Sequence, residues 1–259
     1  MKIMVVIPTY NESRNISKLI EDIFSNLPGC QIVVVDDNSP DGCGDLVEKL
    51  SLKYASLHLI KRVWRKGRGS AGLCGFKYAL SKGMDFIIEM DADFSHQPKY
   101  LSRFQELGKN HDIVIGSRLV KGGRDLDRGL IRTFITKAAG LYIKYLLGIK
   151  VKDVTSGFRG FKAKVLRAID LDSIISNGPV ILQEILFRAQ LLGFRIKEFP
   201  ITFVDRLKGK STFNWRVMVE SLSLIPVFRF IYLPIWKTNL SRKKPDLPRA
   251  RSGQVTFLP

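Results

Sequence analysis

The chain has 259 residues, of which 45% are hydrophobic and 25% charged, a globular composition that excludes disordered, collagen-like and repeat architectures. Its cysteines, Cys30, Cys43 and Cys74, fit no paired spacing, which argues against a disulfide framework or zinc module and for a reducing compartment. The formal net charge of +18 suggests an anionic partner: nucleic acid, a membrane surface or a phosphorylated substrate.

The excess positive charge lies in the middle and at the end of the chain. Residues 1–100 carry 13 basic and 12 acidic side chains, whereas residues 118–167 carry 13 basic and 3 acidic ones. Residues 237–259 add 6 basic side chains against 1 acidic. A nearly neutral first third argues against a nucleic-acid-binding surface spread over the whole protein.

The first half of the chain alternates short apolar runs with stretches of helical periodicity. The predicted strands are Ile3–Ile7, Ile32–Val35, Leu57–Ile60, Phe86–Met90 and Ile113–Ile115, and the predicted helices are Ile16–Leu27, Leu46–Leu52, Ala71–Leu80 and Pro98–Leu107. This βαβ order predicts an α/β fold with a mostly parallel sheet between helices. Ligands of such sheets bind at the carboxyl ends of the strands.

The second half has a different character. Ile131–Leu146 places its apolar residues on one stripe and its basic residues largely off it, which predicts an amphipathic basic helix. Val180–Leu192 predicts a further helix, and the alternation within Phe194–Val204 predicts an edge strand.

An apolar segment and a basic tail follow. Val217–Trp236 is long enough to span a membrane, but it contains Glu220, Arg229 and two prolines, so we interpret it as interfacial or packed. The Lys-, Arg- and Pro-rich residues after Trp236 have little to bury and are predicted to be disordered. Residues 1–10 pass directly into a predicted strand, so we expect no secretory leader.

Two carboxylates directly follow the strand predicted at Phe86–Met90. Asp91-Ala92-Asp93 can hold one hard divalent cation, Mg²⁺ or Mn²⁺, beside the oxygens of a diphosphate. A cation there would neutralise charge on a leaving nucleoside diphosphate. The alternative is that the two aspartates only cap the loop that follows.

Other motifs occur at predicted strand ends and later in the chain. They are Pro8-Thr9-Tyr10-Asn11-Glu12, Val35-Asp36-Asp37-Asn38-Ser39-Pro40-Asp41-Gly42, Gly116-Ser117-Arg118 and Thr155-Ser156-Gly157-Phe158-Arg159. With Asp91-Ala92-Asp93, they make residues 1–215 closely resemble family 2 glycosyltransferases of the GT-A fold, and within that family the polyprenyl- and dolichyl-phosphate mannosyltransferases. The motifs are specific for the family and less so for the sugar.

The resemblance implies a role for individual residues on the donor side. The residues implied around the donor nucleoside are Pro8, Tyr10, Glu12, Val35 and Asp37. Asp91, Ala92 and Asp93 are implied to bind the metal and the diphosphate, with Ser95 as a further, weaker metal contact where some family members have Gln.

On the acceptor side, the resemblance implies that Arg118, Arg132 and Thr136 receive the lipid phosphate.

A further loop of the family closes over the donor phosphates, and Arg206 matches this loop. The family usually has Gly-x-Ser-Lys in this loop, whereas this chain reads Gly209-Lys210-Ser211-Thr212, so Lys210 or Lys208 is expected to replace the missing lysine.

The charge of the acceptor side agrees with this assignment on physical grounds. Transfer to a hydroxyl needs a general base, whereas a phosphate monoester is already anionic near neutral pH. Cations are therefore expected at the acceptor, and Arg118, Arg124, Arg128 and Arg132 supply them. A solvated basic face is the alternative interpretation of these arginines.

Two further patterns are not interpreted as phosphate sites. Gly67–Gly72 matches G-x-G-x-x-G, but it lies far from the first strand and is interpreted as a glycine turn that begins a helix. Gly209-Lys210-Ser211 resembles the end of a P-loop, but Val204 occupies the upstream glycine position. The basic cluster Lys61–Arg68 is interpreted as a solvated loop.

The resemblance, together with these motifs, thus implies a metal-dependent, inverting transfer of mannose from GDP-mannose to a polyprenyl or dolichyl phosphate. Asp91, Asp93, Arg118, Arg132 and Arg206 are the predicted catalytic residues. The alternatives are a UDP-sugar as donor, or a non-catalytic nucleotide-sugar- or RNA-binding protein. We expect no nucleic-acid partner for the transferase.

The sequence patterns and the resemblance also predict how the chain is organised and where in the cell it acts. The predicted divisions are a GT-A domain at 1–215, with a nucleotide-sugar half at 1–117 and an acceptor half at 118–215, an interfacial segment at 216–236 and a basic tail at 237–259. We expect peripheral attachment to an anionic membrane at its cytosolic face, of the endoplasmic reticulum in a eukaryote or the plasma membrane in a prokaryote. Small membrane-anchoring subunits are a further expected partner.

Overall fold

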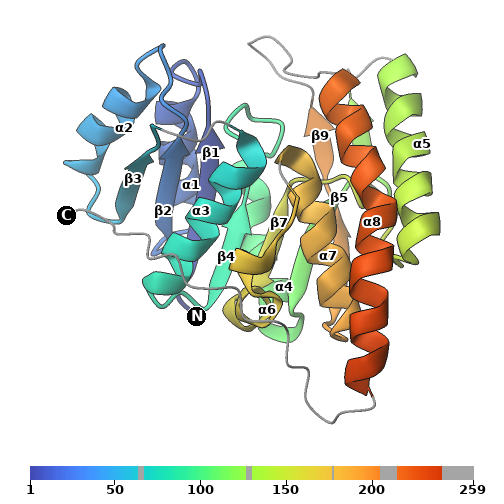
Figure 1. Ribbon diagram of the computed structural model, residues 1–259. Coiled ribbons are helices and arrows are strands. Elements are labelled where there is room, and N and C mark those ends of the chain that lie inside the picture. Colours follow the sequence, from blue (N-terminus) through green and yellow to red (C-terminus); the bar gives the residue numbers. More distant parts are fainter. Residues whose placement is uncertain (64–66, 127–129, 177, 205–214, 241–259) are drawn as a thin grey trace.

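The structure is a computed structural model that describes residues 1–63, 67–126, 130–176, 178–204 and 215–240 (Figure 1). The strands are β1 (Ile3–Thr9), β2 (Gln31–Asp36), β3 (Leu57–Lys61), β4 (Phe86–Glu89), β5 (Ile113–Ser117), β6 (Arg124–Leu126), β7 (Arg159–Lys162), β8 (Ile196–Pro200) and β9 (Thr202–Val204). The α-helices are α1 (Ile16–Asn26), α2 (Cys43–Ser51), α3 (Arg68–Ser81), α4 (Leu101–Asn110), α5 (Leu130–Leu147), α6 (Ala163–Ile169), α7 (Ile181–Leu191) and α8 (Trp215–Leu240). Short 3-10 helices are η1 (Pro98–Tyr100), η2 (Leu171–Ser173) and η3 (Gly178–Val180).

The main sheet has seven strands in the order β3-β2-β1-β4-β7-β5-β8. β1 runs parallel to both of its neighbours, with Val5 opposite Ile32 of β2 and Ile88 of β4. β7 runs antiparallel to β4 and β5, and β8 runs parallel to β5 at the sheet edge. β6 and β9 form a separate two-stranded parallel sheet. The sheet is therefore mixed and mostly parallel, as predicted.

Helices cover both faces of the sheet because its strands are apolar on both sides. Met4 and Val6 of β1 pack into one cluster of buried side chains with residues of α3, α6 and α7. Ile3, Val5 and Ile7 point to the other face and pack into a second cluster with α1, α2 and α4. Figure 1 shows the first group of helices in front of the sheet and α1 behind it. The result is the predicted layered architecture.

The strands predicted in the first half are confirmed, with β1, β2, β3 and β5 one or two residues longer and β4 one residue shorter than predicted. The predicted edge strand Phe194–Val204 is confirmed only for Ile196–Pro200; after Ile201, β9 leaves the main sheet and pairs with β6. The sequence analysis missed β6, β7 and α6. β6 and β7 are three and four residues long and carry charged side chains, so they lack the apolar run that marked the other strands.

The two predicted halves of the domain are interleaved in space. β7 comes from the second half of the chain, yet it lies between β4 and β5 of the first half. A division at residue 117 therefore does not correspond to a boundary in the sheet.

Helix α8 includes the predicted interfacial segment and is part of the folded domain. Ile225, Phe228 and Tyr232 are buried in the first core cluster. The Tyr232 hydroxyl also contacts the carboxylate of Glu184 in α7. The interpretation of this segment as packed is confirmed for this face of α8, so 215/216 is not a structural boundary. Within the described residues, no helix has the length and apolar character needed to cross a membrane.

Candidate active site

A cleft of about 330 Å³ opens at the carboxyl ends of β1, β2 and β4. The strand order reverses direction between β1 and β4, and this is where doubly wound sheets bind ligands. The lining residues are Pro8, Thr9, Tyr10, Glu12, Asp37, Gly67, Arg68, Ala71, Asp91, Ala92 and Asp93. The structure thus gathers three sequence motifs that are far apart in the chain.

The loop after β4 fixes the two aspartates by local hydrogen bonds. Oδ1 of Asp93 accepts from the backbone nitrogen of Ser95 at 3.1 Å and from its hydroxyl at 2.6 Å. Phe94, between them, has a left-handed φ of 62°, an uncommon conformation for a bulky residue, and this turns the chain back toward Asp93. Asp93 is therefore held in one orientation at the cleft wall.

His96 supports the first aspartate through the backbone. Its Nδ1 accepts a hydrogen bond from the Asp91 nitrogen at 2.9 Å, and its ring stacks on Phe158 at 4.8 Å between centroids. Burial lowers the pKa of His96, although the Asp91 and Asp93 carboxylates act in the opposite direction. The lowered pKa favours a neutral ring. His96 is thus a buried residue that positions the loop.

Arg68 lies against the carboxylates of the cleft. Its Nη2 is 2.5 Å and its Nε 2.6 Å from Oδ1 of Asp91, and its Nη1 is 3.5 Å from Oε1 of Glu89. Burial raises the pKa of Glu89 to about 7, although the charge of Arg68 opposes this. The prediction that Lys61–Arg68 is only a solvated loop is wrong for Arg68, because the start of α3 carries it into the cleft.

Arg62 of the same cluster is also an internal partner. Its Nε is 2.7 Å from Oδ1 of Asp37, and the two side chains are 10% and 4% exposed. The backbone nitrogen of Gly67 donates to Oδ2 of Asp37 at 2.5 Å. Burial raises the pKa of Asp37, although Gly67 and Arg62 oppose the shift. The solvated interpretation is therefore wrong for Arg62 as well, since this arginine orders the cleft wall at Asp37.

A second cavity of about 230 Å³ lies beside the start of α5. It is lined by Arg118, Leu119, Asp125, Thr133, Thr136 and Lys137. The structure thus brings Arg118 and Thr136 together, two of the three residues implied to receive the lipid phosphate.

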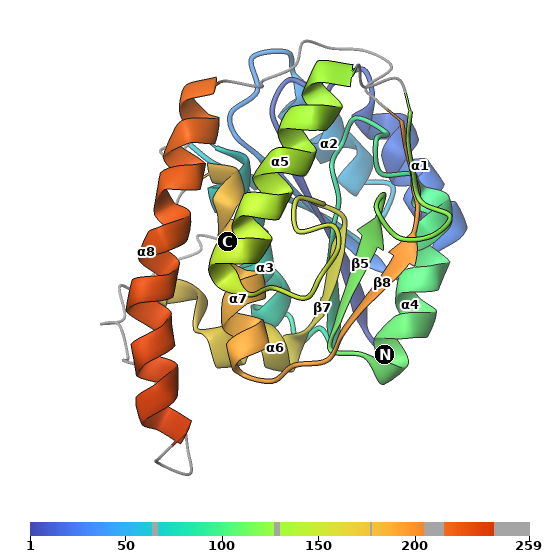
Figure 2. The same cartoon turned by 90° about the vertical axis from the view of Figure 1, so that its right-hand side faces the viewer.

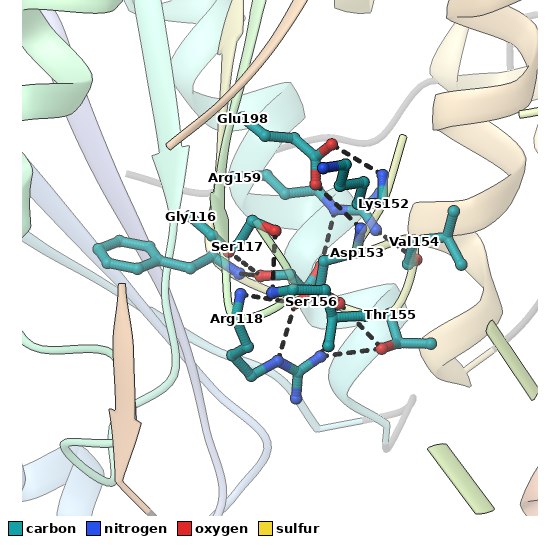
Figure 3. Close-up of polar contacts among 12 residues, drawn as sticks. Gly116, Ser117, Arg118, Lys152, Asp153, Val154, Thr155, Ser156, Arg159 and Glu198 are labelled. Carbon is teal, nitrogen blue, oxygen red and sulfur yellow. Dashed lines mark hydrogen bonds and ion pairs between the residues drawn. The ribbon is translucent and has the colours of Figure 1, made fainter. Parts of the chain in front are cut away.

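Arg118 is held at this cavity by Asp153, which is fully buried (Figure 3). Nε and Nη2 of Arg118 donate to the two carboxylate oxygens at 2.8 and 2.7 Å, and Nη2 also donates to the Thr155 hydroxyl at 2.8 Å. Burial opposes ionisation of Asp153, but its hydrogen bonds and ion pair with Arg118 outweigh this and lower its pKa. Glu198 of β8 fixes the loop by accepting from the backbone nitrogens of Lys152 and Asp153 at 2.7 and 2.9 Å.

Arg159, in the last predicted motif, has a structural position. It is fully buried, and its side chain donates to the carbonyls of Val154, Ser156 and Leu182 at 2.6–2.7 Å. Burial lowers its pKa to about 10. Arg159 therefore holds the 154–156 loop onto α7, behind the cavity wall.

Phe203 of β9 contacts one residue beside each cavity. Its ring lies 5.8 Å from the ring of His96, which supports the Asp91 loop, and Cζ of Arg118 lies 5.1 Å from its centroid. The Asp91 carboxylate also acts electrostatically on both His96 and Arg118. The two cavities are therefore close neighbours in one site.

Some predicted site residues lie away from the cavity walls. Val35 is fully buried in the first core cluster and Ser95 is 1% exposed; neither is among the residues that line the cleft. Arg132 belongs to α5, but its side chain lies outside the described part of the structure. Arg206, Lys208, Lys210 and the tail after residue 240 also lie outside it.

The sequence analysis missed Arg68, Glu89 and Asp153 as parts of the site. Glu89 interrupts an apolar strand, and Asp153 precedes a recognised motif, so each carried a weak signal. Arg68 carried none, because its partners are 21 and 23 residues away and only the fold brings them together.

Comparison with known proteins agrees with the fold and the motifs. The family described as "Glycosyl transferase family 2" matches residues 4–170. An undecaprenyl-phosphate mannosyltransferase of Micrococcus luteus is 40% identical over 222 residues, which cover 86% of this chain and 91% of that protein. A polyprenol monophosphomannose synthase of Mycolicibacterium smegmatis is 38% identical over 221 residues, covering 85% and 83%.

Solved structures show the same fold at low sequence identity. A glucosyl-3-phosphoglycerate synthase of Mycobacterium tuberculosis, in complex with Mn²⁺, UDP-glucose and glycerol 3-phosphate, has a TM-score of 0.58 at 16% identity, covering 99% of this chain and 84% of that one. A mannosyltransferase of Pyrobaculum calidifontis, in complex with GDP-Man and Mn²⁺, has a TM-score of 0.52 at 16% identity, covering 95% and 66%. The predicted fold class is confirmed, and the chain belongs to glycosyl transferase family 2.

Proposed function

We propose that the protein transfers mannose from GDP-mannose to a polyprenyl phosphate. The observation that carries this proposal is the pair of neighbouring cavities, one with two aspartates after β4 and one with Arg118 at its wall. The names of the two relatives, each at least 38% identical over most of the chain, support the sugar and the lipid acceptor.

On the donor side, Asp91 and Asp93 fit a divalent cation. Both line the cleft, they contribute only oxygen ligands, and the Ser95 hydrogen bonds fix Asp93. Such hard oxygen donors suit Mg²⁺ or Mn²⁺, and both structural neighbours contain Mn²⁺ with a nucleotide sugar. When bound, the cation would stabilise negative charge on the departing diphosphate.

The remaining donor-side roles follow from the cleft wall. Pro8, Tyr10, Glu12 and Asp37 line it and are proposed to bind the nucleoside. The buried hydroxyl of Ser95 already bonds Asp93, so we propose that Ser95 positions this aspartate.

On the acceptor side, the protein has to bind an anion and hold it in line with the sugar. Arg118, fixed by Asp153, presents a guanidinium at the wall of the second cavity, where Thr133, Thr136 and Lys137 add hydroxyl and ammonium groups. Arg132 lies one turn before Thr136 in α5, and we propose that it also binds the acceptor phosphate. For the donor phosphates, we propose that Arg206 and Lys210 are the binding residues. The phosphate oxygen would attack the anomeric carbon directly and invert its configuration, and it needs no general base.

A donor screen tests this proposal. The protein, with Mn²⁺ and a short-chain polyprenyl phosphate, is given GDP-mannose, UDP-glucose or UDP-N-acetylglucosamine, and release of GDP or UDP is followed together with the glycolipid. We expect acceptor-dependent release of GDP. Release of UDP would instead identify a UDP-sugar transferase, and salt-dependent RNA binding with no turnover of any donor would favour the non-catalytic alternative.

A lipid acceptor implies a membrane-facing surface, and α5 and α8 provide a candidate. Figure 1 shows both helices at the end of the sheet nearest β5, and Figures 1 and 2 both show them side by side. Phe134, Leu141 and Tyr145 of α5 are 73%, 68% and 86% exposed, and Phe230 of α8 is 77% exposed. The predicted apolar stripe of α5 therefore faces largely outward. We propose that this apolar face rests on an anionic membrane at its cytosolic side.

Vesicle flotation checks this membrane proposal. The triple variant Phe134→Ser, Leu141→Ser, Tyr145→Ser is expected to lose most of its binding to anionic vesicles, because the face inserts apolar side chains. The control is Leu52→Ser with Val63→Ser, two exposed apolar residues near α2 and β3, at the other end of the sheet. Equal binding of both variants would contradict the proposal.

Salt should weaken the binding of the wild-type protein without abolishing it. Each basic side chain near an anionic surface contributes about 1 kcal/mol, screened within roughly 8 Å at physiological ionic strength. The apolar insertion supplies a part of the binding that salt does not remove.

A further inference from the structure

Arg68 is paired with Asp91, one of the two carboxylates proposed to bind the divalent cation. Two of its nitrogens, Nε and Nη2, lie 2.6 and 2.5 Å from the same oxygen, Oδ1 of Asp91. Both side chains line the cleft and each is 29% exposed. A carboxylate proposed to bind the metal is thus already paired with a positive charge of the protein itself.

The fold makes room for this contact through two glycines. Gly67, with φ 135°, turns the chain into α3 so that Arg68 is its first residue. Gly157 lies beside the guanidinium, and a Cβ atom there would be only 2.6 Å from Nη2 of Arg68. Any side chain at position 157 would therefore displace the guanidinium.

Arg68 also has a second acidic neighbour. Its Nη1 is 3.5 Å from Oε1 of Glu89, which is 1% exposed, and Oε2 of Glu89 has no hydrogen-bond partner within the described structure. If Arg68 leaves Asp91, it therefore still has a buried carboxylate beside it. Glu89 lowers the cost of releasing Asp91, because Arg68 is not left without an acidic partner.

We infer that Arg68 competes with the divalent cation for Asp91, holding this carboxylate until cation and donor diphosphate arrive together. The inference rests on the metal-dependent transfer proposed above. A cation alone has to displace the guanidinium from Asp91. When the cation arrives with a diphosphate, the diphosphate oxygens carry negative charge, and Arg68 can turn from Asp91 toward them. Tight cation binding is then coupled to nucleotide binding.

Titration of the full-length protein with Mn²⁺, following the EPR signal of free Mn²⁺, measures this competition without any turnover. Arg68→Met is expected to bind Mn²⁺ alone roughly tenfold more tightly than the wild type, because a charge-assisted contact no longer has to be broken. With saturating GDP, this advantage should disappear or reverse, because the variant has also lost a cation for the diphosphate.

Two further variants separate the contact from a general change of charge. Gly157→Ala keeps the charge of Arg68 but pushes the end of its flexible side chain off Asp91, and should also tighten Mn²⁺ binding in the absence of nucleotide. Arg103→Met removes the same charge from an exposed ion pair with Glu106 on α4, neither residue of which lines the cleft, and should leave the affinity for Mn²⁺ alone within about twofold. Thermal unfolding midpoints show that each variant is folded, and Gly157→Ala serves as the test if Arg68→Met is not.

The outcomes distinguish this inference from the function on which it rests. Equal affinity of the wild type, Arg68→Met and Gly157→Ala for Mn²⁺ alone, with metal-dependent transfer intact, would overturn the competition and leave the transferase proposal standing. A gain in Mn²⁺ affinity for Arg103→Met as large as that for Arg68→Met would overturn it too, as an effect of net charge. Absence of Mn²⁺ binding by every variant, even with GDP, would overturn both proposals.

Discussion

Replacing Asp93 by Asn is expected to lower the rate of mannose transfer by about a hundredfold or more, the usual scale for losing a group that stabilises developing negative charge. The reason is electrostatic. The amide keeps an oxygen that can accept the two Ser95 hydrogen bonds, so the loop should retain its shape, whereas the proposed cation would lose a carboxylate ligand.

Initial rates as a function of Mn²⁺ concentration measure this effect. The matched control is Asp45→Asn, which removes a carboxylate that is 73% exposed on α2 and pairs with Lys61 away from the cleft. The control should keep its activity and its metal dependence. Undiminished transfer by Asp93→Asn at limiting Mn²⁺ would refute the assignment of this aspartate to the metal.

Replacing Asp153 by Asn is expected to destabilise the fold by about 3–5 kcal/mol, the range found when one partner of a buried ion pair is removed. Asp153 is fully buried and accepts three hydrogen bonds from Arg118, two from the guanidinium and one from the backbone nitrogen. The variant leaves a buried guanidinium opposite a neutral amide. Because a carboxylate with a lowered pKa stabilises the fold only while ionised, the wild type should lose this contribution as the pH falls through that pKa.

Urea denaturation compares this variant with Glu106→Gln, which removes a carboxylate that is 61% exposed and pairs with Arg103 on α4. The control should change the free energy of unfolding by less than about 0.5 kcal/mol, as is usual for surface pairs. A similar, small change in both variants would show that Asp153 does not carry the stability assigned to it here.

The sequence predicted the features that depend on local patterns. Apolar runs such as Ile32–Val35 become strands because they can be buried on both faces. The turn residues that follow these strands place Glu12, Asp37 and Asp91 together at the carboxyl ends of the strands. The family motifs added Arg118 and Thr136, which line one cavity. In each case the signal was contained in a few consecutive residues or in a recognised motif.

The features that were missed depend on pairs of residues far apart in the chain. The Arg68 and Asp91 contact, the Arg62 and Asp37 contact and the position of β7 follow from how the elements meet, which no local pattern encodes. The apolar stripe of α5 shows a second reason. Periodicity identifies an apolar face, but it cannot tell whether that face packs inside the protein or, like Tyr145, points away from it.

The position of β7 also has a consequence for the order in which the protein can fold. β5 pairs only with β7 and β8 in the described structure, and β4 has β7 as its second neighbour. The stretch from Ile113 to Ser117 therefore has no strand partner until the ribosome has made the chain at least to Lys162. Such distant pairings slow folding, because a long loop must close before any contact compensates for the lost entropy. A nascent chain in which β5 has left the ribosome but β7 has not therefore carries an unpaired apolar strand. We expect the chain to be most prone to aggregation at this stage of synthesis.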